Sequence, residues 1–294
     1  MRFFKVSLCK YKVHSCFARI ARHAAIALTA VIMSSSMYCK EDKAHPKAIL
    51  SIEPSDGRKK IIAHRGYWTK PGSTENSLSS LANAIELGVY GSEIDVYVTT
   101  DNVVVLNHCP EFQGVVIEQS AFADLAGLRL SNGEPLPTLQ QCIDLVKNQH
   151  RTKLIIEIKP HTSLATENRA VAAVLKAVND NGVAHLVDYI SFSRNICEQL
   201  IKAGPQNRVA LLAYWPHEAM TPRQLKEAGY WGMNYHYDLL KSNPVWISEA
   251  KELGLETMVW TVNYISHMQF FIDSEIEVIT TDLPTKLKEL IVQK

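Results

Sequence analysis

The sequence predicts an α/β protein of the (β/α)8 TIM barrel class, with a short insertion after the second strand. After Lys59, apolar runs rich in β-branched residues alternate with helix-like segments eight times, as in proteins built on a parallel sheet. Polar residues able to do chemistry follow the ends of three of these runs. Because barrel enzymes carry their sites on the ends of several strands, this placement favours a closed barrel over an open doubly wound sheet. The 294 residues exceed the about 250 that such a barrel needs.

Short apolar runs of strand length predict eight strands. They lie at 60–64, 91–98, 153–158, 187–192, 208–213, 230–235, 256–262 and 276–280. The segments between and after them predict eight helices, at 77–87, 138–148, 166–180, 194–203, 221–228, 243–253, 264–273 and 284–292. Ser77 or Asn76 can cap the first helix, and Pro222 and Pro284 stand near the start of two others. Glycine at or just after helix ends supports five boundaries: Gly88, Gly182, Gly204, Gly229 and Gly254.

One interval, 109–136, breaks this alternation. It contains no clear helix–strand unit and includes Pro110 and three glycines. We interpret it as an inserted loop or small subdomain that follows the second strand and lies over the face that carries the site. The sequence has no GxGxxG or Walker A stretch, which weakens a nucleotide-binding fold.

Three parts are expected along the chain: a secretory leader at 1–39, a polar linker at 40–58 and the barrel domain at 59–294. In the leader, a basic stretch precedes the apolar run Ala24–Met33, which is shorter than the about 20 residues that span a bilayer. Ser34–Ser36 offer a cleavage site, so we expect export to the periplasm or the exterior, with an uncleaved anchor as the alternative. Cys39 leaves a lipid anchor open, although Ser36-Met37-Tyr38 before it fits the small-residue pattern poorly.

The charge of the barrel domain excludes one class of partner. The six basic residues of 1–39, which contains no acidic residue, leave 25 of the 31 Lys and Arg against 30 Asp and Glu in the rest. A mildly acidic body gives no basic surface for nucleic acid. Its three cysteines, Cys109, Cys142 and Cys197, are odd in number and widely spaced. We therefore expect buried or partly buried free thiols and no disulfide framework. The oligomeric state stays open.

Two carboxylates stand two residues apart on the second expected strand. Successive strand residues point to opposite faces, so Glu93 and Asp95 share one face while Ile94 and Val96 point toward the helices. The shared face is the barrel interior near its mouth. Two carboxylates held together repel, and they persist when a cation lies between them or when one holds a proton. Hard oxygen ligands select Mg²⁺ or Ca²⁺.

The third expected strand repeats this arrangement. Glu157 and Lys159 alternate around Ile158 and therefore also point inward. Glu157 is the natural third ligand of one divalent cation, and Lys159 can pair with a phosphate. The alternative is a structural salt-bridge network inside the barrel.

Two histidines complete the inventory. His64 ends the first strand and is followed by Arg65, whose guanidinium fork suits phosphate oxygens, and by Gly66, which permits a sharp turn. His108 ends Val103–Asn107, an extension of the second strand, and faces the same mouth. Paired imidazoles suit a general base and a general acid because they titrate near neutrality. His161 and His236 also lie near strand ends and remain open as groups that support the site.

At these residues the chain resembles the glycerophosphodiester phosphodiesterase family. The segments that carry the resemblance, in chain order, are His64-Arg65-Gly66, Thr74-Glu75-Asn76-Ser77, Glu93-Ile94-Asp95-Val96, His108 after a thirteen-residue step, Glu157-Ile158-Lys159, Trp260-Thr261-Val262-Asn263 and Thr280-Thr281-Asp282-Leu283-Pro284. Their joint order and spacing cover about residues 60–290. The resemblance implies a TIM barrel that hydrolyses deacylated phospholipids, which are small-molecule glycerophosphodiesters, to sn-glycerol 3-phosphate and an alcohol.

The resemblance also implies roles for single residues. It implies that Glu93, Asp95 and Glu157 hold the divalent ion and that His64 and His108 form the acid–base pair. Arg65 and Lys159 match phosphate-binding positions, Glu75 matches a residue at the edge of the site, and Trp260 matches an aromatic that flanks the glycerol or the leaving group. Plain barrel packing is the alternative for Trp260.

The chain departs from the family pattern at three places, which bear on its substrate range. Cys109 stands where the family often has Asp, Thr74 replaces the usual proline, and the insertion after His108 is short and lacks an Arg-Thr-rich stretch. Two other functions stay open. One is a phospholipase-D-like or phosphoinositide-cleaving phosphodiesterase on the same barrel. The other is an exported binding protein on a decayed barrel, which the presence of all the expected metal and histidine positions disfavours.

Overall fold

The computed structural model describes residues 59–293. The expected leader, the linker, the anchor at Cys39 and the cleavage site all lie outside these residues, so they stay predictions. Within 59–293, no helix is long and apolar enough to cross a membrane. Cys142 and Cys197 are buried free thiols, as the sequence predicts, and Cys109 is partly buried.

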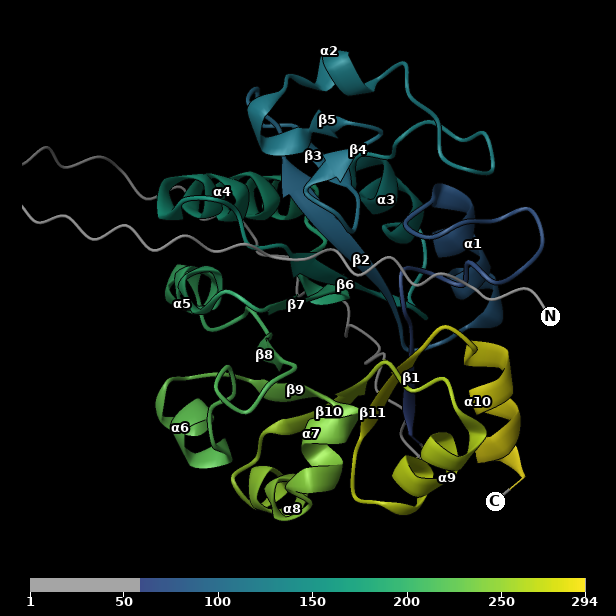
Figure 1. Cartoon of the computed structure of the whole chain (residues 1–294), viewed down its shortest axis with the longest axis vertical. Helices are drawn as coiled ribbons and strands as arrows, with labels where there is room; N and C mark the ends of the chain where they lie inside the picture. The colour runs from purple at the N-terminus through teal and green to yellow at the C-terminus, as the bar shows by residue number, and fades with distance from the viewer. Residues whose placement is uncertain (1–58, 294) are drawn as a thin grey trace, which may run out of the picture. The chain divides into compact units, whose positions relative to one another are not determined.

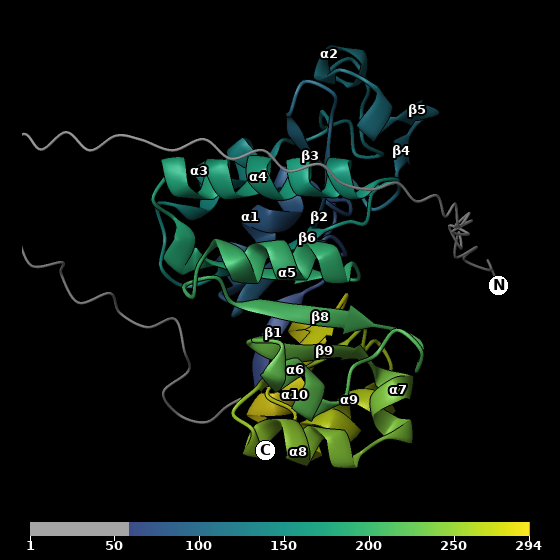
Figure 2. The same ribbon diagram turned by 90° about the vertical axis from the view of Figure 1, so that its left-hand side faces the viewer.

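A closed barrel of parallel strands forms the centre of the described chain (Figures 1 and 2). The strands are neighbours in sequence order, and β1 closes the ring because it pairs in parallel with both β2 and β11. Their bounds are β1 Lys60–Ala63, β2 Gly91–Val98, β6 Lys153–Ile158, β7 Val187–Ser191, β8 Val209–Ala213, β9 Gly232–His236, β10 Glu256–Trp260 and β11 Val278–Thr281. All eight predicted strands are confirmed, and with them the fold class.

Helices surround the barrel (Figure 1). The eight predicted ones appear as α1 Leu78–Leu87, α3 Leu139–Val146, α4 Leu164–Asp180, α5 Arg194–Ala203, α6 Pro222–Glu227, α8 Val245–Glu252, α9 Ile265–Asp273 and α10 Pro284–Val292. Ser77 caps α1 by accepting from the Ser80 amide, and Thr221 caps α6 ahead of Pro222. A further short helix, α7 Tyr237–Ser242, follows β9 directly and was not predicted, because one turn and a half carries too little periodicity to detect.

The barrel strands bury both of their faces. Outward residues such as Ile94 and Val96 join the large core between strands and helices. Inward residues form a smaller core that fills the barrel: Ile62, Tyr90, Ile155, Ile190, Ala210, Leu212, Met258 and Val278. Gly91 permits this packing, since a Cβ there would lie 2.8 Å from the Ile155 side chain. The inner core separates the two ends of the barrel from each other.

A network of buried charges closes the barrel at the amino ends of the strands. The Lys153 ammonium lies 2.7 Å from the Asp188 carboxylate, and the Tyr90 hydroxyl donates to the same carboxylate at 3.0 Å. Lys60 pairs with Glu256 at 2.7 Å. Because each buried charge has a partner of opposite sign, the network tolerates its removal from water.

The insertion is more ordered than the sequence predicts. After β3 Val104–Leu106, it contains the hairpin β4 Glu111–Phe112 and β5 Val115–Val116, the 3₁₀ helix η1 Ile117–Gln119 and the short helix α2 Phe122–Leu125. Its side chains form a separate small core with Tyr97. The insertion stands beside the mouth of the barrel rather than across it (Figure 1).

One sequence interpretation was wrong in this region. Val103–Asn107 does not extend β2, because β3 turns back and pairs with β2 in antiparallel fashion, with Val96 opposite Leu106. The last residues of β2 extend beyond the mouth of the barrel, and β3 leads the chain back to the mouth. The Asn107 amide then donates to the Asp95 carbonyl oxygen at 3.1 Å, which sets the next residue, His108, at the level of the carboxylates.

The charged network at the base predicts a stability effect. Asp188→Asn removes the carboxylate that faces the buried Lys153 ammonium, and we expect a loss of about 3 kcal/mol in the free energy of unfolding, measured by urea denaturation. Asp144→Asn is the matched control, since Asp144 pairs with Lys147 on the surface, and it should leave stability nearly unchanged. Equal stability of Asp188→Asn and wild type would contradict a role for this network in holding the barrel.

Candidate active site

Three buried carboxylates from two neighbouring strands meet at the mouth. Glu93 and Asp95 of β2 and Glu157 of β6 each offer an oxygen, and these oxygens all lie within 4.8 Å of one another. Asp95 stands directly opposite Glu157 in the parallel ladder, and alternation along β2 adds Glu93 on the same face. The structure therefore brings these three residues together as predicted, with their oxygens inside the mouth of the barrel.

The close approach of these carboxylates shifts their pKa values apart. Burial, then the charges of Asp95 and Glu157, raise the pKa of Glu93 well above its usual value. Burial also raises the pKa of Glu157, against the opposing influence of Lys159. Burial opposes ionisation of Asp95 too, but Lys159 and Arg65 outweigh it and hold its pKa below the ordinary value. Asp95 is thus the most readily ionised carboxyl group of the cluster, whereas ionisation of Glu93 and Glu157 is disfavoured.

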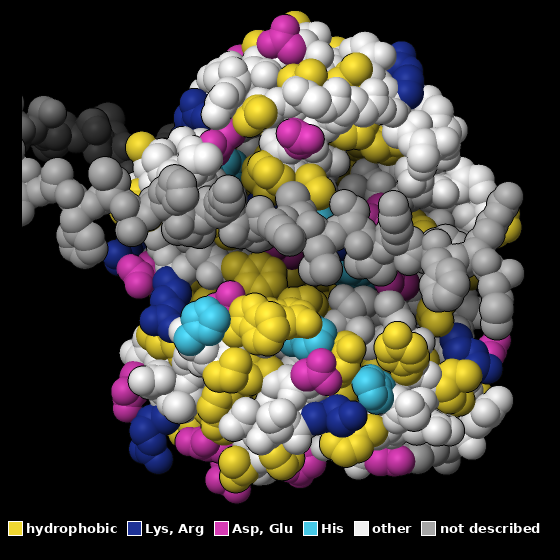
Figure 3. Space-filling view, viewed as in Figure 1, with side chains coloured by type: hydrophobic (Ala, Val, Ile, Leu, Met, Phe, Trp, Pro, Cys, Tyr) yellow, Lys and Arg dark blue, Asp and Glu magenta, His cyan; other side chains and the backbone are white. Residues whose placement is uncertain are grey.

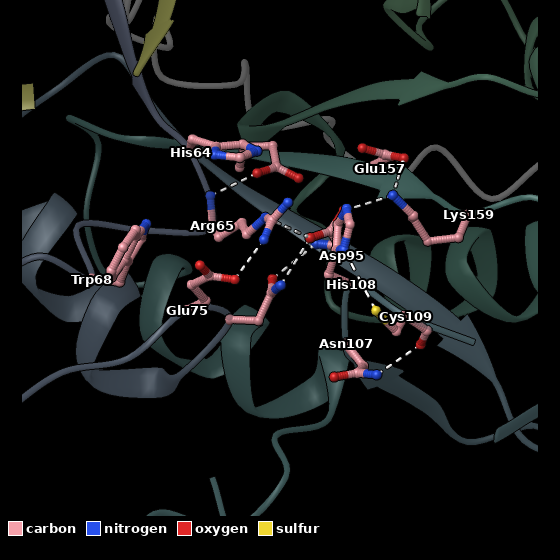
Figure 4. A network of polar contacts seen from close by, with 12 residues as sticks. His64, Arg65, Trp68, Glu75, Asp95, Asn107, His108, Cys109, Glu157 and Lys159 are labelled. Atoms are coloured by element: carbon pink, nitrogen blue, oxygen red, sulfur yellow. Dashed lines mark hydrogen bonds and ion pairs between the residues drawn. The ribbon is translucent and has the colours of Figure 1, made fainter. Parts of the chain in front are cut away.

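Lys159 and Arg65 supply the positive charge of the site (Figure 4). The Lys159 ammonium lies 2.6 Å from the Glu157 carboxylate and 3.1 Å from Asp95, and it is buried. The Arg65 guanidinium donates to Glu75 at 2.5 Å, and its Nε lies 3.6 Å from Asp95. Burial opposes the charge of Arg65, but Asp95 and Glu75 raise its pKa. Glu75 therefore holds the arginine fork at the edge of the site.

The turn after β1 builds the backbone around these groups. Arg65 adopts a left-handed conformation with φ of 54°, and its amide donates to the Glu93 carboxylate at 2.7 Å. Gly66 follows with φ of 78° and donates to the Glu93 carbonyl oxygen. Strained backbone of this kind persists only where surrounding contacts fix it. Here the contacts bind the turn to β2.

His64 is oriented by a carboxylate that the sequence interpretation did not assign to the site. Its Nδ1 lies 2.7 Å from the Asp282 carboxylate, which leaves Nε2 as the nitrogen free to face the mouth. Trp68 donates to the same Asp282 oxygen at 3.1 Å, and Asn263 donates to the other at 2.6 Å. Burial works against ionisation of Asp282, but the His64 contact outweighs it and lowers the pKa of Asp282.

His108 stands on the other side of the carboxylates, beside Asp95 (Figure 4). Its Nδ1 lies 3.8 Å from the Cys109 thiol. Burial lowers the pKa of His108 to about 3, although the Asp95 charge opposes the shift. The imidazole is therefore neutral at pH 7 and able to accept a proton.

Trp260 and the two histidines left open by the sequence make their contacts with groups other than the three carboxylates. Trp260 packs against the inner core and donates to the Asn234 carbonyl oxygen at 3.0 Å. His236 lies beside it, with ring centroids 5.2 Å apart. His161 accepts from the Val98 amide at 3.3 Å and so supports the backbone of β2.

Asn76 is another site residue without an assigned role. Its side chain donates to the Asp95 carboxylate at 2.8 Å and accepts from the Asp95 amide at 3.0 Å, so it fixes this carboxylate in place. Asp282 directly follows β11 and Asn263 lies three residues after β10, and the reasoning applied to His64 and His108 could have found them. Trp68 lies within a loop and carries no comparable signal.

The donor set fits a hard divalent cation. One buried oxygen of Glu93, Oε1, has no hydrogen-bond partner, and a buried carboxylate oxygen left in this way is costly unless something binds it. The three carboxylates offer the oxygen ligands that Mg²⁺ and Ca²⁺ prefer. The residues of β2 and β6 could therefore hold such an ion.

A barrel whose mouth combines carboxylates, paired imidazoles and buried cations is that of an enzyme acting on an anionic ester. Residues 64–286 match the family model described as the glycerophosphoryl diester phosphodiesterase family, which covers most of the described chain. The protein belongs to this family and is a phosphoric diester hydrolase.

Individual relatives agree with this assignment. A crystal structure of a glycerophosphodiester phosphodiesterase from Parabacteroides distasonis is 39% identical, with a TM-score of 0.77, and the match covers 80% of this chain and 97% of that one. A glycerophosphodiester phosphodiesterase of Caldanaerobacter subterraneus is 22% identical over 79% of this chain and 97% of its own length. A phosphodiesterase of Oleispira antarctica, solved with the product sn-glycerol-3-phosphate, shares the fold at 21% identity and a TM-score of 0.69, with 81% of this chain and 98% of that one covered.

The turn after β1 predicts a steric effect. In Gly66→Ala the new Cβ would lie 2.2 Å from the Ser80 hydroxyl oxygen and 2.7 Å from a Ser80 backbone carbon. We expect a loss of about 2–4 kcal/mol in the free energy of unfolding. Gly72→Ala is the matched control, since Gly72 has a similar φ of 83° but nothing within 4 Å of the Cβ position, and it should cost about 1 kcal/mol. Equal losses in thermal or urea unfolding of the two variants would contradict the steric account.

Proposed function

We propose that the protein hydrolyses glycerophosphodiesters to sn-glycerol 3-phosphate and an alcohol, using one divalent cation and two histidines. The observation that carries this proposal is the cluster of Glu93, Asp95 and Glu157 with an imidazole on either side. The membership of the chain in its family and the names of its relatives support the substrate class.

Glu93, Asp95 and Glu157 would hold the cation, which is Mg²⁺ or Ca²⁺. When bound, the ion supplies positive charge that neutralises the phosphodiester and stabilises charge developing on its oxygens. Lys159 shares this task, because its ammonium lies in the same cluster, and Arg65 offers its guanidinium from the edge of the site. Glu75 positions the Arg65 fork for a phosphate.

The two histidines would divide the proton transfers. His108 is partly buried at the mouth and neutral at pH 7, and we assign it the removal of a proton from the nucleophile. His64 donates through Nε2 to the leaving alkoxide, while Asp282 holds Nδ1 and stabilises the imidazolium before the transfer. The nucleophile is either the glycerol 2-hydroxyl, which gives a transient cyclic phosphate, or water. Trp260 would flank the glycerol or the leaving group.

Release of sn-glycerol 3-phosphate tests the proposal directly. The purified chain should release it from glycerophosphoglycerol in the presence of Mg²⁺ or Ca²⁺, and a chelator should abolish the release, because the repelling carboxylates then lose their counter-ion. Coupled detection of sn-glycerol 3-phosphate measures the rate. Full activity in excess chelator would contradict the metal dependence, and absence of release from any glycerophosphodiester would overturn the proposed function.

The assigned base gives a second prediction. His108→Ala should lower kcat about 10²–10⁴-fold and leave the unfolding temperature close to that of the wild type, since His108 lies at the surface of the mouth rather than in the core. His185→Ala is the matched control because His185 is exposed and lies at the opposite end of β7, just before Val187. Wild-type turnover in His108→Ala would remove this histidine from the mechanism.

A further inference from the structure

A buried carboxylate of the insertion, that of Glu118 in η1, holds the loop that follows β6. Its Oε2 accepts from the Thr162 backbone amide at 3.1 Å, and its Oε1 accepts from the Thr162 hydroxyl. Glu118 is only 9% exposed, and a buried carboxylate is costly unless its oxygens are hydrogen-bonded. Glu118 thus fixes both the backbone and the side chain of Thr162.

A short and stiff stretch of chain separates Thr162 from Lys159. It consists of Pro160 and His161. The proline ring fixes its own φ angle and restricts the backbone of Lys159, the residue before it. The Lys159 amide donates to the Val96 carbonyl oxygen of β2 at 3.1 Å, and the His161 ring accepts from another β2 amide at 3.3 Å. The stretch therefore follows β2 with little freedom, so a displacement of Thr162 is passed on to Lys159.

The Lys159 ammonium is the group of the site for which this placement matters most. It is buried between two carboxylates, 2.6 Å from Glu157 and 3.1 Å from Asp95. A lysine side chain has a flexible four-carbon stem, so its ammonium returns to one place only when the backbone that carries it is fixed. A misplacement of about 1 Å can lower the rate about 10²-fold.

The insertion is anchored well enough to act as a support. Ile117, which precedes Glu118, is fully buried in the small core that contains Tyr97 of β2. The Thr100 amide, just after β2, donates to the Ser120 carbonyl oxygen at 2.9 Å. The surface of the insertion, at the top of Figure 3, consists mostly of polar side chains and backbone with scattered apolar ones. Its apolar core and its backbone contacts therefore fix η1 against β2.

A second contact ties the insertion to the loop after β1. The Glu134 carboxylate accepts from the Ser79 amide, in the first turn of α1, at 3.3 Å. The Asn132 side chain donates to the Gly72 carbonyl oxygen at 3.3 Å. Because β2 lies between β1 and β6 in the barrel, the insertion bridges the loops on either side of the strand that carries two of the carboxylates.

We propose that Glu118 is a positioning residue for the hydrolysis, which acts through Thr162 to hold the Lys159 ammonium in place for the phosphate. This inference rests on the proposed function, which assigns the phosphate to Lys159. Glu118 would contribute to turnover from the insertion without touching the substrate. The competing account is that Glu118 serves only the stability of the fold, and the experiment separates the two.

A double-mutant cycle between positions 118 and 159 tests the proposal. Glu118→Ala in the full chain, at saturating Mg²⁺, should lower kcat for glycerophosphoglycerol about five- to twentyfold. In the background of Lys159→Met, which lacks the ammonium, the same substitution should change kcat by less than about twofold, because the group through which it acts is gone. Glu118→Gln should stay close to the wild type, since its amide group can accept from the Thr162 amide and donate to the Thr162 hydroxyl.

Glu167→Ala is the matched control. Glu167 of α4 is also buried, and its carboxylate also accepts two hydrogen bonds from the chain after a strand, from the Ser193 hydroxyl and the Asn195 side-chain amide, each at 2.9 Å. That part of the chain follows β7 and carries none of the charged groups of the site. Glu167→Ala should lower the unfolding temperature about as much as Glu118→Ala does and keep the wild-type kcat.

Two results would overturn the inference: a wild-type kcat in Glu118→Ala, or an equal loss with and without Lys159. If Glu118→Ala does not fold, Thr162→Val takes its place, because Thr162 is exposed and the change removes only the hydroxyl donor. It should lower kcat by a smaller factor, and only when Lys159 is present; an unchanged kcat would again overturn the inference.

Failure of the proposed function gives a different result. The wild type would then release no sn-glycerol 3-phosphate from glycerophosphoglycerol. The same cycle would be measured on bis(4-nitrophenyl) phosphate, a general substrate of phosphodiesterases that presents the same phosphodiester group to Lys159. Coupling between positions 118 and 159 on that substrate would support the positioning role, and additive losses would refute it.

Discussion

The crowding of negative charge in a buried mouth is the constraint on which the site depends. Glu93, Asp95 and Glu157 lie within 4.8 Å of one another, away from water, where such repulsion is strong. Lys159 and Arg65 compensate part of it from the same site. One oxygen of Glu93 has no hydrogen-bond partner, so the protein itself leaves part of this negative charge uncompensated. A divalent cation at this point would outweigh the remaining negative charge, and the resulting positive charge would face the phosphodiester.

Strand alternation, parallel register and one antiparallel strand bring these groups together. Strand parity aims Glu93 and Asp95 inward, and the parallel register sets Asp95 opposite Glu157. His108 arrives differently, because β2 runs past the mouth and β3 returns antiparallel to it. The inner core below and the charged network at the base isolate the mouth from the other end. The barrel therefore gathers the charged groups of the site at one of its ends.

Most of the barrel and the carboxylate cluster could be predicted from the sequence, since both follow from short-range periodicity and from alternation along single strands. The path to His108 could not, because a short antiparallel return leaves no periodic signal. Contacts across large sequence separations were also missed. Asp282 reaches His64 from 218 residues away, and nothing local to either residue reveals that pairing.

Direct observation of the ion tests the central claim most sharply. Crystals of the full chain grown with Mn²⁺ or Ca²⁺ should show one anomalous scattering peak at about 2.1–2.6 Å from oxygens of Glu93, Asp95 and Glu157, with the Lys159 ammonium displaced from at least one carboxylate. The same crystals of Glu93→Gln should show a weaker peak or none. A peak elsewhere, or an active protein with no ion among these carboxylates at saturating metal, would contradict the account.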